Sequence, residues 1–317
     1  MSKPIGSEWS VMLISRLFLL NFLLLWQLGT GTPTFDDRID EVESNGSLPD
    51  DEVSALQLLS KNLLSKDTTQ LTLTHPICST EPSSEIKCSC HSKKNQSVCS
   101  VIGIFLQSKN LDGSIDPSIG HFANLVVLDL LNNQLSGGIP STLGNLQHLK
   151  YLDLSSNSLT GSIPPNLTKL HSLEYLDLYS NKLSGIIPKE LGKLSLLSSL
   201  SLSFNKLSSQ IPKELGNLSY LVSMYLGFNE LTGQLPPELG RLRFLGNLDL
   251  SFNNLTGGIP DSMKNLTLTK MFLTGNMLNG TVPSWVPDTI EDKADLSYNN
   301  FEIPRDGPKK GEGKLNM

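Results

Sequence analysis

Five aspartates are the residues of this chain whose type and spacing could do chemistry. They occupy the same position of a repeated segment: Asp129, Asp153, Asp177, Asp249 and Asp295. Two carboxyl groups on neighbouring segments can act as an acid pair in hydrolysis. A carboxylate that simply recurs with a repeat is more typical of a solvated polar surface. We therefore expect these aspartates to face solvent and to catalyse nothing.

Cysteine and histidine offer a second possible chemistry. The four cysteines, Cys78, Cys88, Cys90 and Cys99, lie close together, with His75 and His91 beside them. In an exported chain an even number of cysteines predicts two disulfides, and three pairings remain open. A zinc site is the competing interpretation, although the spacing fits no zinc module. The sequence has no GxSxG, HExxH, P-loop or GxGxxG motif, so we predict no enzyme activity, metal or cofactor.

The aspartates belong to a unit that recurs from about Val101 to Pro304, with the pattern LxxLxLxxNxLxGxIPxxLxxLxx. Its asparagine position begins at 109, where Lys109 replaces the asparagine, and then steps by 24 residues six times and by 23 twice. A fixed period of this length with this leucine pattern is typical of a leucine-rich repeat solenoid. We therefore predict nine repeats over 101–304 in an α/β repeat solenoid. It should be a right-handed superhelix with parallel strands on the concave face and 3-10 or loop returns on the convex face.

Each repeat is expected to hold one short strand. In LKYLDLSSN, residues 149–157, the leucines point inward, whereas Tyr151 and Asp153 alternate outward. The asparagine that follows can bond backbone groups of its own and of neighbouring turns, so stacked repeats should form a ladder. The predicted ladder consists of Asn133, Asn157, Asn181, Asn205, Asn229, Asn253, Asn276 and Asn299.

The outward positions of the predicted strands are rich in aromatic residues. Exposed aromatic side chains on a rigid face are typical binding anchors. We predict a ligand-binding set of Tyr151, Asp153, Tyr175, Asp177, Tyr179, Tyr225, Phe228, Asp249 and Phe272 on the concave face. The position just before the asparagine holds Phe204, Phe228, Phe252 and Tyr298. For these four, packing on one another as a lateral spine is an equally good interpretation.

The segments outside the repeats have distinct compositions. Residues 1–31 contain the apolar run LFLLNFLLLWQL followed by small residues, which predicts a secretory signal peptide. An uncleaved signal anchor is the alternative, although the run is short for a membrane span. Residues 32–49 form an acidic flexible leader, and residues 50–100 an N-terminal cap with a helix at 50–65 and the four cysteines. Residues 305–317 are polar and glycine-rich and should be a disordered tail.

Seven N-x-[ST] sequons indicate a glycosylated chain that is secreted or lies on the extracellular face of the plasma membrane. They are Asn45, Asn95, Asn166, Asn217, Asn254, Asn265 and Asn279. We place Asn217 and Asn265 on the convex return, and Asn166, Asn254 and Asn279 on loops. None occupies a concave strand position. The net charge of −6, without a basic stripe, argues against a nucleic-acid partner.

Two stretches carry a resemblance to a known family. LSGIIPKELGKLSLL, residues 183–197, is similar to the plant-specific class of leucine-rich repeats, which covers about 101–304. LPDDEVSALQLLSKNL, followed by Cys78 and by IKCSCHSKKNQSVCSVIGIFLQSKNLDGSI, resembles the start of plant leucine-rich-repeat receptor-like kinases with a malectin-like domain after the repeats. The resemblance implies a receptor ectodomain truncated before the malectin-like, transmembrane and kinase regions. A gene-model fragment and a genuine secreted form are the alternatives, and kinase activity is not carried over.

These observations predict a non-catalytic extracellular recognition module. Its ligand would be a peptide, a protein or a cell-wall saccharide on the concave face, with a receptor-kinase co-receptor as a further partner. A membrane would be involved only through the missing C-terminal regions or an uncleaved signal anchor. The alternative is a secreted inhibitor of microbial cell-wall-degrading enzymes, similar to polygalacturonase-inhibiting proteins. Those inhibitors usually carry cysteine pairs at both ends, whereas this chain has no cysteine after Cys99.

Overall fold

The computed structural model describes residues 47–64, 78, 85–93, 96–286 and 294–302. The predicted signal peptide, most of the acidic leader, the predicted tail, Asn45 and Asn95 lie outside the described residues. Within the described residues, no helix combines the length and the apolar character that crossing a bilayer requires.

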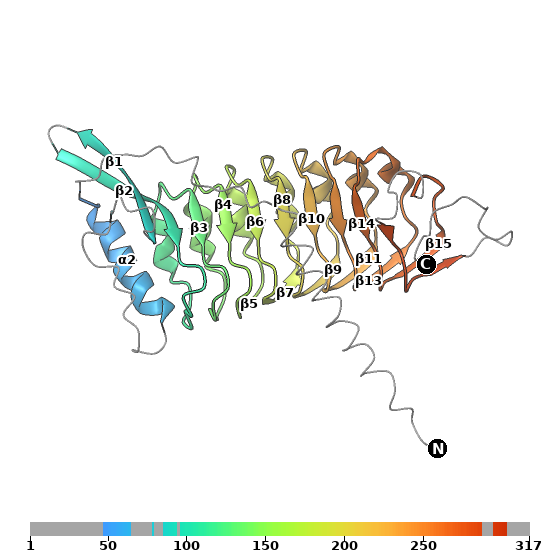
Figure 1. Ribbon diagram of the computed structural model, residues 1–317, viewed down its shortest axis with the longest axis horizontal. Coiled ribbons are helices and arrows are strands. Elements are labelled where there is room, and N and C mark those ends of the chain that lie inside the picture. The colour runs from blue at the N-terminus through green and yellow to red at the C-terminus, as the bar shows by residue number, and fades with distance from the viewer. Residues whose placement is uncertain (1–46, 65–77, 79–84, 94–95, 287–293, 303–317) are drawn as a thin grey trace, which may run out of the picture. The chain divides into compact units, whose positions relative to one another are not determined.

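The repeats contribute one strand each to a ten-stranded sheet, called the main sheet below (Figure 1). It corresponds to the predicted concave face. Its strands pair in parallel and in register, except for the antiparallel pair β1–β2 at one end. In order along the sheet they are β1 (Ile86–Lys93), β2 (Gln96–Phe105), β3 (Val127–Asp129), β4 (Tyr151–Asp153), β6 (Tyr175–Asp177), β8 (Ser199–Ser201), β10 (Ser223–Tyr225), β12 (Asn247–Asp249), β14 (Lys270–Phe272) and β16 (Ala294–Asp295).

A second parallel sheet, which the sequence did not predict, runs through the segments after the asparagines (Figure 1). Its strands are β5 (Thr160–Gly161), β7 (Lys182–Ile186), β9 (Lys206–Gln210), β11 (Glu230–Gln234), β13 (Asn254–Gly257), β15 (Met277–Thr281) and β17 (Asn300–Glu302). The placement of Asn254 and Asn279 on loops was therefore wrong, because they lie on β13 and β15. Each strand pairs with the equivalent segment of the next repeat, so this sheet exists only when repeats stack.

The returns of the first seven repeats are five-residue 3-10 turns, as predicted. The turns are η2 (Pro117–His121), η3 (Ser141–Asn145), η4 (Pro165–Lys169), η5 (Lys189–Lys193), η6 (Lys213–Asn217), η7 (Pro237–Arg241) and η8 (Asp261–Asn265). From η3 onward a proline precedes each turn, and its ring fixes φ close to the value that the turn needs, as at Pro188 with φ −61°. The turn ends at a buried leucine, for example Leu194, whose N–H bonds to Leu191 O at 3.0 Å.

Columns of leucine fill the space between the two sheets and the turns. Leu149, Leu152, Leu154 and Leu159 of one repeat are each 0% exposed, and the equivalent residues of the neighbouring repeats are buried as deeply. Burying a leucine contributes about 1.5–3 kcal/mol, but only when the adjacent repeats cover it. The repeats therefore stabilise one another rather than folding singly.

A helix covers the N-terminal end of the repeats. Helix α2 (Asp50–Leu63) ends two residues before the predicted boundary and buries Leu56, Leu59 and Leu63 against the first repeat. Its last carbonyls bond to that repeat, with Gly113 N–H donating to Leu63 O at 2.9 Å. A Cβ at position 113 would lie 2.0 Å from Asn62 O, so only glycine permits this approach.

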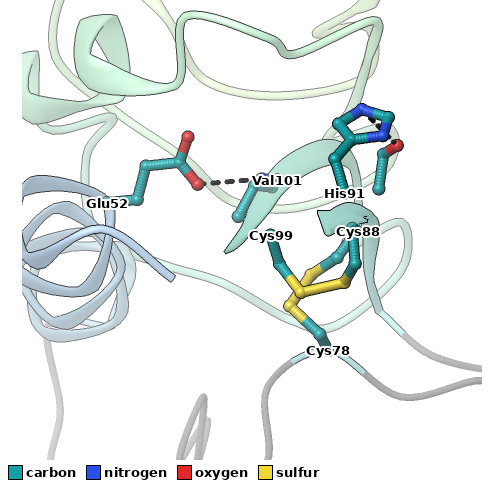
Figure 2. Close-up of a disulfide and its surroundings, with 8 residues drawn as sticks. Glu52, Cys78, Cys88, His91, Cys99 and Val101 are labelled. Carbon is teal, nitrogen blue, oxygen red and sulfur yellow. Dashed lines mark hydrogen bonds between the residues drawn. A yellow bond between two sulfur atoms is a disulfide. The ribbon is translucent and has the colours of Figure 1, made fainter. Parts of the chain in front are cut away.

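A buried hydrogen bond joins the helix to the cysteine hairpin. Glu52, 3% exposed, accepts a hydrogen bond from Val101 N–H at 2.8 Å (Figure 2). The hairpin of β1 and β2 carries the disulfides Cys78–Cys88 and Cys90–Cys99. The prediction of two disulfides is confirmed. The competing zinc interpretation is wrong, because all four thiols are consumed.

Candidate recognition surface

Two tyrosines form a stacked pair on the main sheet. Tyr151 on β4 and Tyr175 on β6 are register partners, and their rings stack with centroids 4.4 Å apart and planes 5° apart. Their hydroxyls donate to Asp153 Oδ2 at 3.3 Å and Asp177 Oδ2 at 3.1 Å. We call this pair the tyrosine platform. It is half-buried and fixed from below, which makes it a preorganised flat surface.

Four of the five repeat aspartates are buried, including the two beneath the platform, so the expectation that they face solvent was wrong, and Asp295 is half-buried. Asp153, Asp177 and Asp249 are 2%, 2% and 3% exposed. The Oδ1 atom of each accepts the N–H two residues further on, at 2.9, 2.8 and 2.9 Å. Strand alternation sets the direction in which these side chains point. It does not reveal that tyrosine rings and these N–H groups close over them.

Burial changes the acid–base properties of these carboxyl groups. Loss of hydration raises the pKa of Asp129 to about 6. Loss of hydration, followed by the neighbouring charge of Asp153, raises the pKa of Asp177 to about 7. The pKa of Asp153 and that of Asp249 are raised for the same first reason. These groups therefore titrate closer to neutrality than ordinary aspartates do.

Three phenylalanines, each just before an asparagine of the ladder, form an aromatic spine along one side of the main sheet, whereas Tyr298 in the same position is 73% exposed. Phe204, Phe228 and Phe252 stack at centroid distances of 4.1 and 4.4 Å, and Tyr179 meets Phe204 edge-on at 5.2 Å. All three phenylalanines have positive φ, between 51° and 58°. This left-handed backbone conformation costs about 1–2 kcal/mol for a residue with a Cβ, and the stacking of the rings offsets that cost. Phe228, one of the predicted ligand contacts, is thus a half-buried member of the spine.

Tyr225 and Phe272 form a second aromatic region on the main sheet. Both are half-buried and share one strand position, with Asp249 between them as their common register partner. Ser199, Ser201 and Ser223 separate Tyr225 from the tyrosine platform. The main sheet therefore presents two aromatic areas with a floor of small hydroxyl side chains between them. Such a surface suits an extended ligand with spaced side chains.

The asparagines hold the repeats together and do not face this surface. Asn181 is representative: its Nδ2 donates to Leu154 O of the preceding repeat at 2.9 Å, and its Oδ1 accepts from Leu159 N–H at 3.0 Å. The same two types of bond recur at Asn133, Asn157, Asn205, Asn229, Asn253, Asn276 and Asn299. Each asparagine thus completes the hydrogen bonding of the repeat before it.

The sequons within the described repeats lie away from the main sheet. Asn217 and Asn265 are exposed at the ends of η6 and η8, on the return as predicted. Asn166 is half-buried in η4, so its placement on a loop was wrong. Asn254 and Asn279 are exposed on the second sheet. An oligosaccharide on any of these five would leave the strands of the main sheet uncovered.

Sequence reasoning missed an apolar strip beside the main sheet. Leu196, Tyr220 and Phe244 occupy one position of three successive repeats and are 46%, 58% and 61% exposed. The rings of Tyr220 and Phe244 are parallel within 6°, with centroids 6.4 Å apart. The 24-residue spacing of these residues was the signal that could have revealed the strip.

Sequence reasoning also missed the role of Asp116, which occupies the position of the later prolines. Its carboxylate accepts from Ser118 N–H at 2.8 Å and from the Asn62 side chain of helix α2. This aspartate therefore caps η2 and ties the helix to the first repeat.

Ser209 is an exception in the second sheet. It occupies a position that is glycine in the neighbouring repeats and keeps the same positive φ, 70°. At Gly233 a Cβ would meet the side chain of Gln210 at 2.7 Å, so that glutamine lies across the glycine. Ile186 of the preceding repeat holds the position of Gln210. Ser209 has a Cβ where Gly233 has none, and the Ile186 side chain beside it is 61% exposed.

Metal chemistry has no arranged donor set in the described part of the chain. No group of three or more histidine, cysteine, aspartate or glutamate side chains there is placed to hold a metal ion. The aspartates of the main sheet are occupied by backbone N–H, serine and tyrosine donors instead.

Comparisons with known proteins agree with the repeat architecture. Residues 100–224 match the family described as leucine-rich repeat region, and residues 220–242 and 244–266 match leucine rich repeat, which together span just over half of the chain. No match was found among the curated proteins.

Among solved structures, the complex of PEPR1 with AtPEP1 is 33% identical over 78% of this chain and 35% of that one, with a TM-score of 0.66. The Arabidopsis receptor kinase HAESA ectodomain with an extended IDA peptide hormone is 35% identical over 68% of this chain and 36% of that one, with a TM-score of 0.61. A second HAESA complex, with IDA and the co-receptor SERK1, is 31% identical over 80% of this chain and 46% of that one, with a TM-score of 0.60.

This chain spans less than half the length of these receptor chains. Its parallel sheets and 3-10 returns nonetheless reproduce their solenoid. The chain therefore belongs to the leucine-rich repeat proteins, and its repeats have the fold of plant receptor-kinase ectodomains.

Proposed function

We propose that this chain is a non-catalytic, extracellular recognition module that binds a peptide or protein on its main sheet. The observation that carries the proposal is the arrangement of three tyrosines on that sheet: Tyr151 and Tyr175 stack on β4 and β6, and the serines of β8 separate them from Tyr225 on β10. Tyrosine anchors on a rigid surface lose little conformational entropy on binding and supply most of the energy at many interfaces. The spaced arrangement matches an extended peptide better than a compact small molecule.

The positions of the sequons support this choice of surface. The five described sequons lie on the 3-10 returns and on the second sheet, so glycans on them would restrict partners to the main sheet and its borders. The predicted signal peptide and the two disulfides support an extracellular location, where such bonds persist.

The structural neighbours support a peptide ligand and a co-receptor. PEPR1 and HAESA were solved with AtPEP1 and IDA, and HAESA also with SERK1. By analogy we propose a secreted peptide as the first ligand and a receptor-kinase co-receptor as the second partner. A membrane receptor that carries further regions, as in the class with a malectin-like domain, would be one setting for such a module.

A binding screen tests the proposal. The full chain, secreted from plant cells, is titrated with a panel of synthetic plant signalling peptides, and any binder is measured again with Tyr175→Ala and Tyr225→Ala. We expect each change to weaken binding by about 10-fold or more, the loss typical of an anchor residue. Tyr298→Ala is the matched control, because Tyr298 is 73% exposed and lies outside the strands of the main sheet. Unchanged affinity in both main-sheet variants would refute the placement of the ligand.

Tyr175 also bonds to Asp177, so its role in binding must be separated from its role in folding. Tyr175→Phe keeps the ring and removes only the hydroxyl, and the melting temperature of each variant identifies unfolding. Fungal polygalacturonases and cell-wall oligosaccharides form two further arms of the screen. Inhibition of the enzymes with no peptide bound would replace the receptor proposal by the inhibitor alternative.

A further inference from the structure

Three aspartates lie in a row beneath the tyrosine platform. Asp129, Asp153 and Asp177 are register partners on β3, β4 and β6 and are 8%, 2% and 2% exposed. Neighbouring strands lie about 4.8 Å apart, so each carboxyl group has another carboxyl group beside it. The row is bounded by uncharged register partners, Phe105 on β2 and Ser201 on β8.

The row and the platform are bonded to one another. Asp153 and Asp177 each accept a backbone N–H on Oδ1, from Ser155 at 2.9 Å and Tyr179 at 2.8 Å. On Oδ2 they accept the hydroxyls of Tyr151 and Tyr175. Movement of either carboxyl group therefore moves a ring of the platform.

The groups that surround the row supply no positive charge to it. On β4 and β6 the neighbouring titratable groups are Tyr151, Tyr175 and Tyr179, and beyond Ser201 they are Tyr225 on β10 and Asp249 on β12. Of the nearby lysines, Lys150 pairs with Glu174 at 3.2 Å, and Lys87 of β1 lies 5.4 Å from the centre of the Phe105 ring. Within the described residues, none of the three aspartates forms an ion pair.

Three adjacent carboxyl groups without a cation cannot all ionise cheaply in a dehydrated position. The pKa directions agree with this geometry: burial raises the pKa of all three, to about 6 for Asp129 and about 7 for Asp177. A carboxyl group whose pKa is higher in the folded than in the unfolded chain contributes to the stability of the fold. The whole contribution is present below about pH 4, where the group is protonated in both states. That stability is lost as the pH rises through the folded-state pKa, so the affected window extends to about pH 7.

We propose that Asp129, Asp153 and Asp177 form a proton-controlled latch that holds the tyrosine platform in place. In mildly acidic solution the row carries protons, the carboxyl groups do not repel one another, and the two rings stay bonded above them. As the pH rises past neutrality the protons are lost. Repulsion between adjacent carboxylates then loosens β3, β4, β6 and the platform. The latch needs no ligand, so it stands independently of the proposed function.

Thermal unfolding of the full chain between pH 5 and pH 8 tests the latch. We expect the melting temperature of the wild type to fall by about 4–8 °C over this range, since the stability contributed by the protonated row is lost there. The double variant Asp153→Asn, Asp177→Asn keeps the shape and one hydrogen-bond acceptor of each side chain. It should melt higher than the wild type at pH 8 and fall less with pH, since only Asp129 of the row still titrates.

Asp249→Asn is the matched control. Asp249 has the same cap from Ser251, with N–H at 2.9 Å and Oγ at 2.6 Å, but its register partners Tyr225 and Phe272 are uncharged. This variant should keep most of the wild-type fall. A wild-type melting temperature that is constant from pH 5 to pH 8 would overturn the proposal. So would a double variant that falls as steeply as the wild type, or a control that removes the fall equally.

A second measurement covers the case in which the double variant does not fold. Infrared spectra of the wild type should show the C=O stretch of protonated carboxyl groups at pH 6 and lose it by pH 8. The near-ultraviolet circular dichroism of tyrosine should change over the same range, because the hydroxyls of Tyr151 and Tyr175 bond to the row. Absence of the protonated band at pH 6 refutes the latch without any variant.

Discussion

Replacing Asn181 by alanine isolates the energy of one rung of the ladder. The side chain makes four hydrogen bonds: Nδ2 donates to Leu154 O, Leu178 O and Tyr179 O, and Oδ1 accepts from Leu159 N–H. The three carbonyl groups keep other donors after the change. These are Asn157 Nδ2 at 3.2 Å, Asn205 Nδ2 at 2.9 Å and Ser156 N–H at 2.8 Å.

The N–H of Leu159, whose residue is 0% exposed, loses the acceptor that the structure provides. An unsatisfied buried donor costs about 1–3 kcal/mol, so we expect Asn181→Ala to lose that much stability. For a domain of this size 1 kcal/mol lowers the melting temperature by about 2–4 °C. Lys182→Ala, an exposed neighbour, should cost under about 0.5 kcal/mol. Equal melting temperatures of the two variants would show that the reasoning about buried donors is wrong.

Asn181→Asp sharpens the test, because it keeps the acceptor but turns an oxygen toward three carbonyl oxygens. Partial burial and the facing carbonyl oxygens should raise the pKa of the new carboxyl group, so the variant should be least stable at neutral pH and recover partly in acid.

Four further experiments test other parts of the structure. Gly192→Ala should cost about 1–3 kcal/mol in denaturant unfolding, because a Cβ there would lie 2.1 Å from Glu214 O. Gly258→Ala, with its nearest atom at 3.6 Å, is the matched change and should be nearly neutral. Ser209→Gly should raise the melting temperature, since relief of about 1–2 kcal/mol of strain at φ 70° exceeds the added freedom of the unfolded chain; a fall would show that Ser209 is not strained. Phe228→Ala should cost about 1–3 kcal/mol by removing two ring contacts of about 0.5–1.5 kcal/mol each, and a stability equal to the wild type would rule out a structural spine. Asn254→Gln and Asn279→Gln should each remove one glycan from the secreted chain. Each variant should then have a lower mass than the secreted wild type, with the enzymatically deglycosylated chain as the reference, and an unchanged mass would exclude that site.

Most of the repeat unit could be predicted from the sequence, because its determinants are local. The alternation around Leu152 identifies a strand, Asn157 identifies the turn after it, and Pro164 precedes the predicted 3-10 return. The helix over 50–63 was equally accessible from its apolar spacing and its acidic first turn. These features depend on one repeat or on one helix face.

What the sequence did not reveal depends on contacts between repeats. The second sheet forms by pairing Lys182–Ile186 with Lys206–Gln210, and neither segment has the alternation that marks a strand. The burial of Asp153 and Asp177 depends on rings and N–H groups that only the folded strand position brings over them. The pairing of the four cysteines depends on the hairpin register, in which Cys90 is opposite Cys99.

The asparagine ladder gives the array a direction that agrees with the direction of protein synthesis. Leu159 N–H receives its acceptor from Asn181, which leaves the ribosome after it, and the same is true of Leu135 with Asn157 and Leu183 with Asn205. A repeat is therefore finished only when the next one has been made, so each new repeat supplies what the older one lacks. The hydrogen bond between helix α2 and β2 has the opposite order, because Glu52 has already been made when Val101 needs its acceptor. Growth of the chain thus adds each new repeat to one that still lacks the acceptor that the new repeat brings.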